Sequence, residues 1–474
     1  MINRIFVISN NIIALMKRSV YLYSICCLIL FSCNSNHFKT IRLNDTSAWN
    51  KKGNVICGED ELILSDRNST AVTTSAYKNF ILELEVKTEE GAIGAIHFHA
   101  DGFGTNTDGY EVLINNNSEP DEWRKTGSLS TIRNFGKCVA WNNEWTPIRI
   151  EVVDKNIKVY VKDLFIVDYT EPSYPYRTEE NKKRILDYGI FMLCNYSDSP
   201  IAFRNMKVKP LDKDLFNRVN AQDEQNDDII RLSQINFPTI DEHLHLKGGL
   251  TKEDVAELTR KYGITYGLSP NCGKKFPIQN DEQIYQWLDT MQNTLCFLAG
   301  QAEGREWLEM FSLDAISEFD YMFTDALTWT DHKGRRMRLW IPEETFVDDK
   351  QQFMDMLVER ACEIITTEPV DIYVNPTFLP QELNPEYDQL WTKERMDKVI
   401  EACINRKIAI EIGCRYRIPS QKFIQRAKDK GAKFTIGTNN EGIHDVGKLE
   451  YAVEMINACN LTADDMWIPT SKNR

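Results

Sequence analysis

The sequence predicts two folded domains, an all-β sandwich of two sheets followed by an α/β barrel, behind an N-terminal targeting segment. Three observations lead to this prediction. The chain has 474 residues, more than one domain usually holds. Residues 40–210 form short stretches in which apolar and polar positions alternate. Residues 233–474 instead alternate apolar runs of strand length with helical stretches.

The composition narrows the class of protein. Lys and Arg number 56 against 70 Asp and Glu, which gives a net charge of −14. Because phosphate repels so acidic a chain, nucleic acid is not an expected partner. Hydrophobic residues make up 42% of the sequence, which is enough for folded cores and excludes a largely disordered protein.

Residues 1–33 have the pattern of a lipoprotein signal peptide. Met16-Lys17-Arg18 supplies positive charge, residues 20–31 form a short apolar run, and Leu30-Phe31-Ser32-Cys33 follows. That ending resembles the lipobox of bacterial lipoproteins. The resemblance implies lipidation of Cys33, a membrane contact through the lipid anchor, and location in the cell envelope at the outer membrane or periplasmic face. A transmembrane anchor is the alternative, although the apolar run is short for a span.

Residues 40–210 form the first domain. Phe80, Leu82, Leu84 and Val86 alternate with charged residues, and similar alternation follows at 148–152 and 157–162. A period of two with one apolar face is typical of half-buried antiparallel strands. About a dozen such strands imply two sheets packed face to face.

The motifs of this domain occur in a familiar order. They are Tyr77-Lys78-Asn79-Phe80, Gly109-Tyr110-Glu111-Val112-Leu113-Ile114, Thr126-Gly127-Ser128-Leu129, Glu144-Trp145 and Phe203-Arg204-Asn205-Met206-Lys207-Val208. This order resembles the 3-keto-disaccharide hydrolase (3-keto-glucoside lyase/hydratase) domain. The resemblance implies a concanavalin-like jelly roll and a carbohydrate substrate. The chain departs from the family at Leu113, where a Gln is usual, and at His99, near the position of a usual Arg.

His97 and His99 are two residues apart, so both side chains are expected on the same face of a strand. With Glu111 they form a candidate site for a sugar or a metal. A His beside a carboxylate suits proton removal next to a ketone, so His99 and Glu111 are the candidate catalytic pair, and His97 and Tyr110 are candidate substrate-binding residues. The alternative is a domain that only binds carbohydrate, with Tyr110, Trp123 and Trp141 as stacking faces.

Residues 211–232 are polar and are expected to form a linker that buries little. Beyond them, the predicted strands are 238–246, 264–268, 295–300, 319–325, 371–376, 408–413 and 434–437, and the predicted helices include 251–261, 352–365, 394–405, 421–430 and 446–458. Parallel strands need such crossover helices. Seven strands with helices outside fit an α/β barrel better than an open sheet. Thr251 and Asp254 predict a capping box at the first helix.

The first of these strands carries Asp241-Glu242-His243-Leu244-His245. Positions 241, 243 and 245 are expected to share a face, with Ile240 and Leu244 toward the helices. Active sites of such barrels lie at the carboxyl ends of the strands, where two imidazoles can hold one metal. The alternative is a pair of structural histidines with satisfied hydrogen bonds.

His243-x-His245, with Glu303 at the end of the third strand, resembles the PHP superfamily (polymerase and histidinol phosphatase), which is close to amidohydrolase barrels. The resemblance implies a distorted seven-stranded barrel and metal-dependent hydrolysis, with His332 in the region of a further ligand. The sequence departs from the family at Ser269-Pro270-Asn271, Val374-Asn375-Pro376 and Thr438-Asn439-Asn440. We therefore expect one divalent metal ion, of unspecified identity, held by His243, His245 and Glu303, with Asp325 as the alternative third ligand.

Other polar residues at the strand ends suit a pocket for a polar anion or a sugar. Asp325 and Glu411 are the candidate catalytic residues that move a proton. The candidate substrate-binding residues are Arg305, Arg336, Asn375, Arg415 and Asn439, because guanidinium groups are forked donors to carboxylate or phosphate. The alternative is that these charges pair with one another. Trp340, Met354 and Met356 are expected in the core.

The sequence thus predicts an envelope-anchored, carbohydrate-processing enzyme. The sandwich binds or cleaves a (3-keto-)glycoside, and the barrel is a metal-dependent hydrolase of a polar or anionic product. Two alternatives remain: only the sandwich is catalytic, as a 3-keto-glycoside lyase/hydratase, or the protein is a non-enzymatic glycan-binding lipoprotein.

Overall fold

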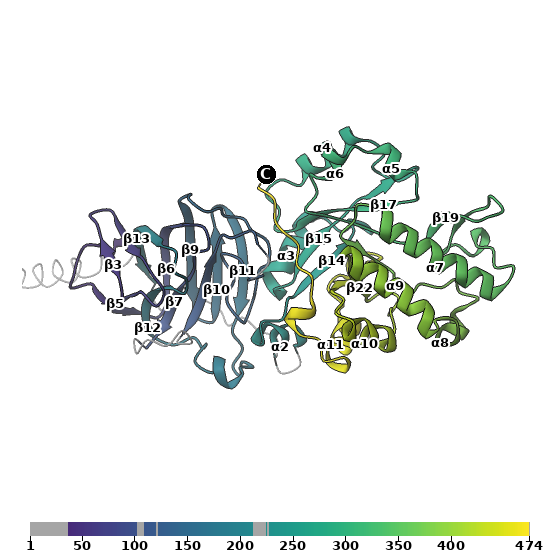
Figure 1. Cartoon of the computed structure of the whole chain (residues 1–474). Coiled ribbons are helices and arrows are strands. Elements are labelled where there is room, and N and C mark those ends of the chain that lie inside the picture. Colours follow the sequence, from purple (N-terminus) through teal and green to yellow (C-terminus); the bar gives the residue numbers. More distant parts are fainter. Residues whose placement is uncertain (1–36, 102–108, 120–121, 212–223, 225–226, 474) are drawn as a thin grey trace, which may run out of the picture.

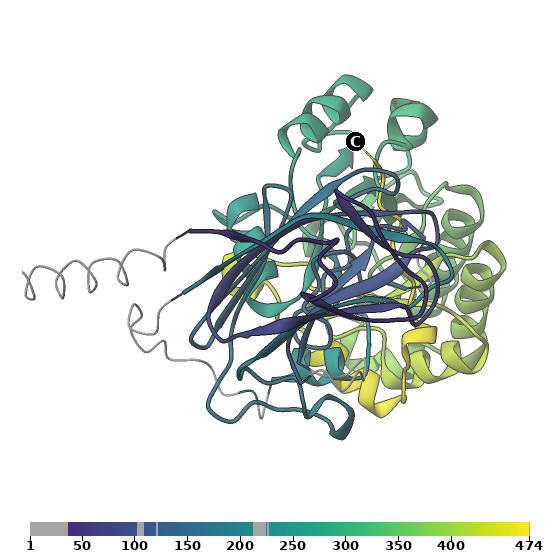
Figure 2. The same cartoon turned by 90° about the vertical axis from the view of Figure 1, so that its left-hand side faces the viewer.

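The computed structural model describes residues 37–101, 109–119, 122–211, 224 and 227–473. They form a β sandwich beside a barrel (Figure 1), and a view along the long direction of the molecule places the sandwich in front of the barrel (Figure 2). Cys33 and most of the predicted linker lie outside the described residues. No helix in the described part of the chain has both the length and the apolar character that a membrane span requires.

The sandwich is a jelly-roll-like stack of two antiparallel sheets. One sheet has the order β11-β10-β9-β6-β13-β4-β3, with β1 beside β13, and the other has the order β2-β5-β12-β7-β8. Their bounds are β1 (Lys39–Thr40), β2 (Trp49–Lys52), β3 (Val55–Cys57), β4 (Glu61–Leu64), β5 (Thr70–Tyr77), β6 (Phe80–Thr88), β7 (Ile93–Ala100), β8 (Tyr110–Asn115), β9 (Thr146–Val153), β10 (Asn156–Val161), β11 (Leu164–Thr170), β12 (Gly189–Asn195) and β13 (Ile201–Pro210). As the alternation predicts, every second residue of β6 is buried between the sheets.

His99 breaks the alternation of β7. The register of β12 against β7 shifts beside it, and His99 has a φ of 57°. Its ring packs edge-on against Phe80 in the core. His97 lies on the opposite face, because its neighbours Ile96 and Phe98 belong to the core. The expectation that His97 and His99 face the same way is therefore wrong.

The C-terminal part is a nearly closed barrel of parallel strands in the order β14-β15-β17-β18-β21-β22-β23, with β16 beside β17. The strands are β14 (Ile240–Leu244), β15 (Thr265–Leu268), β16 (Asn271–Gly273), β17 (Phe297–Glu303), β18 (Tyr321–Thr324), β21 (Ile372–Tyr373), β22 (Ala409–Gly413) and β23 (Phe434–Gly437). All seven predicted strands are present. The Asn439 N–H donates to the His243 carbonyl over 2.8 Å and so links the last strand to the first.

Helices cover the outside of the barrel. The longer ones are α3 (Lys252–Tyr262), α4 (Asp281–Thr290), α7 (Lys350–Thr367), α9 (Lys393–Arg406), α10 (Gln421–Asp429) and α11 (Glu450–Ala458); the short ones are α5 (Trp307–Met310), α6 (Leu313–Ile316) and α8 (Tyr387–Leu390). The five predicted helices are confirmed, and the capping box of Thr251 and Asp254 begins α3. The helices α4 to α6 and the hairpin of β19 (Thr328–Thr330) and β20 (Arg336–Arg338) were not predicted.

The first barrel strand does not follow simple alternation. Ile240 points into the barrel, where it packs with Phe297 and Phe323 of β17 and β18. Leu244 faces the helices, as predicted. Asp241 accepts a hydrogen bond from the Thr438 backbone N–H over 2.9 Å and so joins β23. The predicted orientation of Ile240 toward the helices is wrong, because the pairing of β14 with β15 shifts register between Asp241 and Leu244.

A segment of the sandwich closes the base of the barrel. Trp123, only 3% exposed, lies in the same apolar cluster as Ile240, Phe297 and Ile372 from the barrel interior. Its indole N–H donates to the side-chain oxygen of Asn236 over 3.0 Å. Burial of so large a ring across the junction means that the two domains share a core.

The described end of the predicted linker is also buried. Glu224 is 3% exposed and accepts from Tyr169 over 2.6 Å, besides an ion pair with Arg177 at 3.0 Å. Helix α2 (Asp228–Gln234) follows and buries Ile230. The expectation of a linker that buries little is wrong for these residues.

Candidate functional site

A cluster of polar side chains lies on the face of the second sheet that points away from the sandwich core. His97 of β7 and Glu111 of β8 stand opposite each other in register. The His97 Nε2 lies 2.7 Å from the Tyr196 hydroxyl and 3.6 Å from Glu111 Oε2. Arg184 donates to the same carboxylate oxygen over 3.0 Å, and Tyr196 donates to it over 3.3 Å.

This cluster holds an ionised carboxylate. Burial alone would raise the pKa of Glu111, but the positive charge of Arg184 and the neighbouring His97 outweigh it and lower that pKa to about 2. A carboxylate with so low a pKa is a weak base. Glu111 therefore suits binding and orientation of its neighbours better than the proton removal predicted for it.

Two of the residues predicted for the sandwich site lie elsewhere. The His99 ring nitrogens contact the Lys78 carbonyl (2.8 Å) and the Asp187 backbone N–H (3.2 Å). Tyr110 is fully buried in the core, where its hydroxyl donates to Glu171 over 2.6 Å. Neither can join Glu111, so the His–carboxylate pair is His97 with Glu111. Sequence reasoning missed Tyr196 and Arg184, which come from segments far from β7 and β8.

Two histidines face each other at the carboxyl end of β14. Their Nε2 atoms are 3.1 Å apart, and both rings are buried. His243 Nδ1 lies 2.6 Å from Glu411 Oε1, and its ring packs on Phe323. His245 Nδ1 lies 2.8 Å from the Ser269 carbonyl. The predicted His-x-His pair is thus brought together, with Glu411 behind it.

The hydrogen bonds define the state of the rings. A carbonyl only accepts, so His245 carries its proton on Nδ1, and its Nε2 is a bare lone pair. Burial lowers the pKa of His243 to about 3 and that of His245 far below its usual range, so both rings are neutral. The lone pair of His245 therefore meets a cation, or it accepts the proton of a neutral His243 on Nε2, in which case the bare Nδ1 of His243 accepts from a protonated Glu411.

Glycine makes room for this arrangement. A Cβ on Gly437 of β23 would stand 2.1 Å from Glu411 Oε1 and 2.8 Å from the His243 Cβ. Only a residue without a side chain lets the carboxylate reach the ring there.

Two further carboxylates lie at the same end of the barrel. Glu303 accepts from the Asn271 side chain over 2.7 Å, and Asp325 accepts from the Asn375 side chain over 3.2 Å. Burial raises the pKa of both groups, and the charge of Asp325 raises that of Glu303 further. The Asn375 backbone N–H also donates to Glu411 over 2.8 Å. These predicted residues therefore form one polar layer above the apolar floor of the barrel.

The charges predicted to bind substrate are mostly paired. Arg305 pairs with Glu368, Arg336 with Glu306, and Arg415 with Glu441 at 2.6 Å. Asn439 contacts Asn375 at 3.4 Å. The alternative weighed for the arginines, that they pair within the protein, describes all three.

The structure brings together two of the side chains predicted to hold a metal, His243 and His245. The facing Nε2 atoms suit two ligands of one ion, and each Nδ1 has the carboxylate or carbonyl partner usual for a metal-bound imidazole. Among the residues that the structure describes, however, no three His, Cys, Asp or Glu side chains gather closely enough to hold a metal. Glu303 and Asp325 thus do not complete the expected set. His332 is exposed, 3.0 Å from Met356 Sδ.

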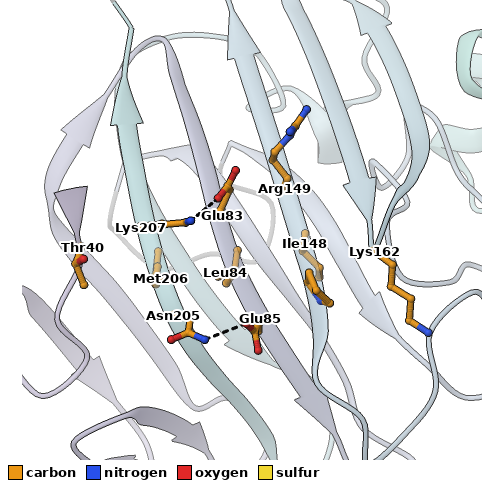
Figure 3. Close-up of a pocket in the computed structure, with 11 residues that line it drawn as sticks. Thr40, Glu83, Leu84, Glu85, Ile148, Arg149, Lys162, Asn205, Met206 and Lys207 are labelled. Carbon is orange, nitrogen blue, oxygen red and sulfur yellow. Dashed lines mark hydrogen bonds and ion pairs between the residues drawn. The ribbon is translucent and has the colours of Figure 1, made fainter. Parts of the chain in front are cut away.

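Cavities open on both domains. A groove of ≈ 520 Å³ lies on the outward face of the first sheet, where Lys207 pairs with Glu83 and Asn205 bonds Glu85 (Figure 3). Its polar groups largely satisfy one another. A cavity of ≈ 700 Å³ lies among the loops after β20, β21 and β22 and includes Trp340, which is 37% exposed and therefore not in the core as predicted.

Comparison with known proteins bears on the sandwich. Residues 41–209 match the family described as the 3-keto-alpha-glucoside-1,2-lyase-like domain. A search of curated proteins gives no match. Among solved structures, a putative glycosyl hydrolase from Parabacteroides distasonis ATCC 8503 is 19% identical over 37% of this chain and 100% of its own, with a TM-score of 0.32. The carbohydrate binding module CBM66 from Bacillus subtilis is 17% identical over 35% of this chain and 97% of its own, with a TM-score of 0.27.

The family match covers the sandwich from β2 to β13, including the cluster around Glu111. It ends before the barrel. The N-terminal domain is therefore a carbohydrate-related jelly roll of the 3-keto-disaccharide hydrolase type.

Proposed function

We propose that this protein is a two-domain, envelope-anchored, carbohydrate-processing enzyme. The sandwich binds or cleaves a (3-keto-)glycoside, and the barrel is a metal-dependent hydrolase that acts on a polar or anionic product. The observation that carries the barrel's role is the 3.1 Å approach of the His243 and His245 Nε2 atoms, each with its Nδ1 engaged.

His243 and His245 are the two protein ligands of the proposed ion. An ion held by these two histidines would polarise a carbonyl or lower the pKa of a water molecule. Glu411 orients His243 through their 2.6 Å contact, and the Ser269 carbonyl orients His245 over 2.8 Å. Both rings thereby keep their Nε2 lone pairs directed at one point, which reduces the cost of assembling the site.

Asp325 and Glu303 supply carboxyl groups at the same end of the barrel. Both are buried and both hydrogen-bond to amide side chains, and among the described residues neither carboxyl group forms an ion pair with an Arg. Asp325 is the group we assign to proton transfer, since Glu411 is committed to His243. Asn271 and Asn375 hold the two carboxyl groups in place.

In the sandwich, His97 is the group we assign to proton transfer. Its Nε2 contacts the Tyr196 hydroxyl, and the anionic Glu111 stabilises a proton that His97 takes up. Arg184 holds Glu111 ionised. This division of roles fits proton removal beside a ketone, the reaction that the matching family's description as lyase-like implies.

A second candidate function is a sandwich that only binds glycan. The observation that favours it is the low pKa of Glu111, because a permanently ionised carboxylate with an Arg partner is a typical sugar hydroxyl acceptor. Turnover of a 3-keto-glycoside by the full chain, lost in His97→Ala, would exclude this candidate. Binding without turnover would support it.

Elemental analysis of the purified full chain tests the barrel's role. We expect about one equivalent of a divalent metal in the unmodified chain, and loss of most of it in His243→Ala and in His245→Ala. His332→Ala is the matched control, because this histidine is exposed in the same domain. Equal metal content in all four proteins, or none in any, would leave the histidines as a proton-sharing pair.

Glu303→Ala separates the two possible roles of that carboxylate. If Glu303 is a ligand that moves on metal binding, this variant loses metal as the histidine variants do. If it acts only on substrate, metal content is unchanged and hydrolysis falls. Anchoring is tested separately, by labelling cells with a radioactive fatty acid and comparing the unmodified chain with Cys33→Ser.

A further inference from the structure

An aromatic cleft opens among the loops at the carboxyl end of the barrel. Its volume of ≈ 700 Å³ lies within the roughly 300–1,000 Å³ of small-molecule sites. The segments that line it follow β20, β21 and β22, so they come from the same end of the barrel as the facing histidines. Ligand sites of barrels are built from these loops.

The lining of the cleft combines aromatic rings with amides. Phe378 and Tyr416 form an edge-to-face pair with centroids 5.0 Å apart, and Trp340 is exposed beside them. Gln381 and Asn384 are exposed on the cleft and supply hydrogen-bond donors and acceptors without net charge. Aromatic faces with nearby amides match the two sides of a pyranose ring, which has apolar C–H faces and a rim of hydroxyl groups.

The cleft adjoins a second cavity through Arg415, which follows β22. Arg415 lines this cleft and also the ≈ 370 Å³ cavity beside it, and its guanidinium lies 5.1 Å from the centre of the Tyr416 ring. Burial raises the pKa of Tyr416, and Asp325 and Glu411 are among the charges that raise it further.

We propose that this cleft is a glycan subsite: a pyranose ring stacks on Trp340 and Tyr416 while the adjoining part of the same molecule reaches the carboxyl end of the barrel strands. This inference rests on the proposed function in one respect, because the barrel's reaction would take place on that adjoining part. The substrate of the barrel is then a molecule of two or more linked units, at least one of them an intact sugar ring.

Isothermal titration of the full chain with maltose, cellobiose and lactose tests the subsite. At least one disaccharide should bind, and Trp340→Ala and Tyr416→Ala should each weaken that binding about tenfold, the expected loss for one aromatic stacking partner. Tyr285→Ala is the matched control, because this exposed tyrosine lies on α4, outside the residues that line the cleft. Methyl glucoside, with one ring, should bind more weakly than the best disaccharide.

The proposal is overturned if none of the three disaccharides binds at millimolar concentration, or if Trp340→Ala and Tyr416→Ala bind as the unmodified chain does. The latter result would place all sugar binding in the sandwich. Metal content separates this outcome from failure of the proposed function. Neither Trp340 nor Tyr416 is a proposed metal ligand, so both variants should retain the metal of the unmodified chain. If the unmodified chain contains no metal, and both variants still bind the sugar more weakly, the metal-dependent hydrolase is rejected and the glycan subsite is retained.

Discussion

Single residues decide what each polar cluster can do. Glu111 and Glu411 are both buried carboxylates beside a histidine, yet their pKa values move in opposite directions. Burial would raise the pKa of Glu111, but the positive charge of Arg184 outweighs it and lowers that pKa to about 2, whereas burial raises the pKa of Glu411 to about 8. The sandwich cluster therefore contains a fixed negative charge, and the barrel pair contains a group that can share its proton.

The low pKa of Glu111 predicts a pH dependence of stability. When a carboxylate has a lower pKa in the folded chain than in the unfolded chain, its contribution to the free energy of unfolding is complete above the unfolded pKa of 4.5. That contribution is lost as the pH falls toward the folded pKa of about 2. Glu111→Gln should lower the free energy of unfolding by about 3 kcal/mol at neutral pH and flatten its decline between pH 4.5 and 2. Urea unfolding at several pH values measures both effects.

Glu179→Gln serves as the control for this prediction, because the Glu179 side chain is 85% exposed and forms a surface ion pair with Lys182 across one helical turn. Its stability should follow the unmodified chain at every pH. Equal acid sensitivity of the Glu111 variant and the unmodified chain would mean that Arg184 and His97 do not stabilise the carboxylate.

The secondary-structure elements predicted best are those in which apolar residues recur with a regular period. The strand β6 and the helix α9 follow their expected patterns because one face of each meets a continuous apolar core. The errors fall on β7 and β14, where a shifted register turns His99 and Ile240 to the other side. A one-residue shift is invisible to periodicity, since it preserves composition and changes only which side chain faces inward.

Glycines were the signal that could have located the shift in β7. A Cβ on Gly109 would stand 2.2 Å from the Phe98 carbonyl oxygen, and one on Gly189 would stand 2.5 Å from the carbonyl carbon of His99. Both strands beside His99 therefore need glycine where the bulge presses against them. The barrel pair was predictable for a different reason: His243 and His245 are close in sequence, whereas Tyr196 and Arg184 reach Glu111 only through the folded sheet.

The start of α3 gives a prediction at the same scale. The Thr251 hydroxyl accepts from the Asp254 backbone N–H over 3.1 Å, and the Asp254 carboxylate accepts from the Thr251 backbone N–H over 2.9 Å. Thr251→Ala should lower the free energy of unfolding by about 1 kcal/mol, because the Asp254 N–H loses its acceptor and the Asp254 carboxylate loses the hydrogen bond from the Thr251 hydroxyl. Thr366→Ala in α7 should change it by less than about 0.5 kcal/mol, since that exposed hydroxyl bonds only carbonyls of its own helix. Equal losses in chemical denaturation would contradict the capping argument.

At the scale of the whole molecule, the sandwich and the barrel are joined by shared core and by hydrogen bonds across the junction. The Gly136 N–H donates to Thr265 at the start of β15 over 2.8 Å, and Arg133 donates to the carbonyl of Lys261 in α3 over 2.7 Å. The C-terminal segment runs along the same junction (Figure 1), where the Ser471 hydroxyl accepts from the Cys138 N–H over 2.8 Å. This junction leaves the carboxyl ends of the barrel strands free for ligands.

A variant of Trp123 tests the coupling of the two domains most directly. The segment that follows Trp123 runs beside β8, where the Ser130 N–H donates to the Glu111 carbonyl over 2.9 Å. The cluster around Glu111 and the Trp123 segment that closes the base of the barrel therefore belong to one connected stretch.

Trp123→Ala removes a ring packed on Ile240, Phe297 and Ile372 and should lower the free energy of unfolding by about 3–5 kcal/mol. The unmodified chain should unfold in one calorimetric transition, and this variant in two, with the barrel melting first. Trp145→Ala, which removes a half-buried ring on the sandwich surface, should shift the transition without splitting it. A single transition in both variants would show that contacts of the junction other than Trp123 couple the two domains.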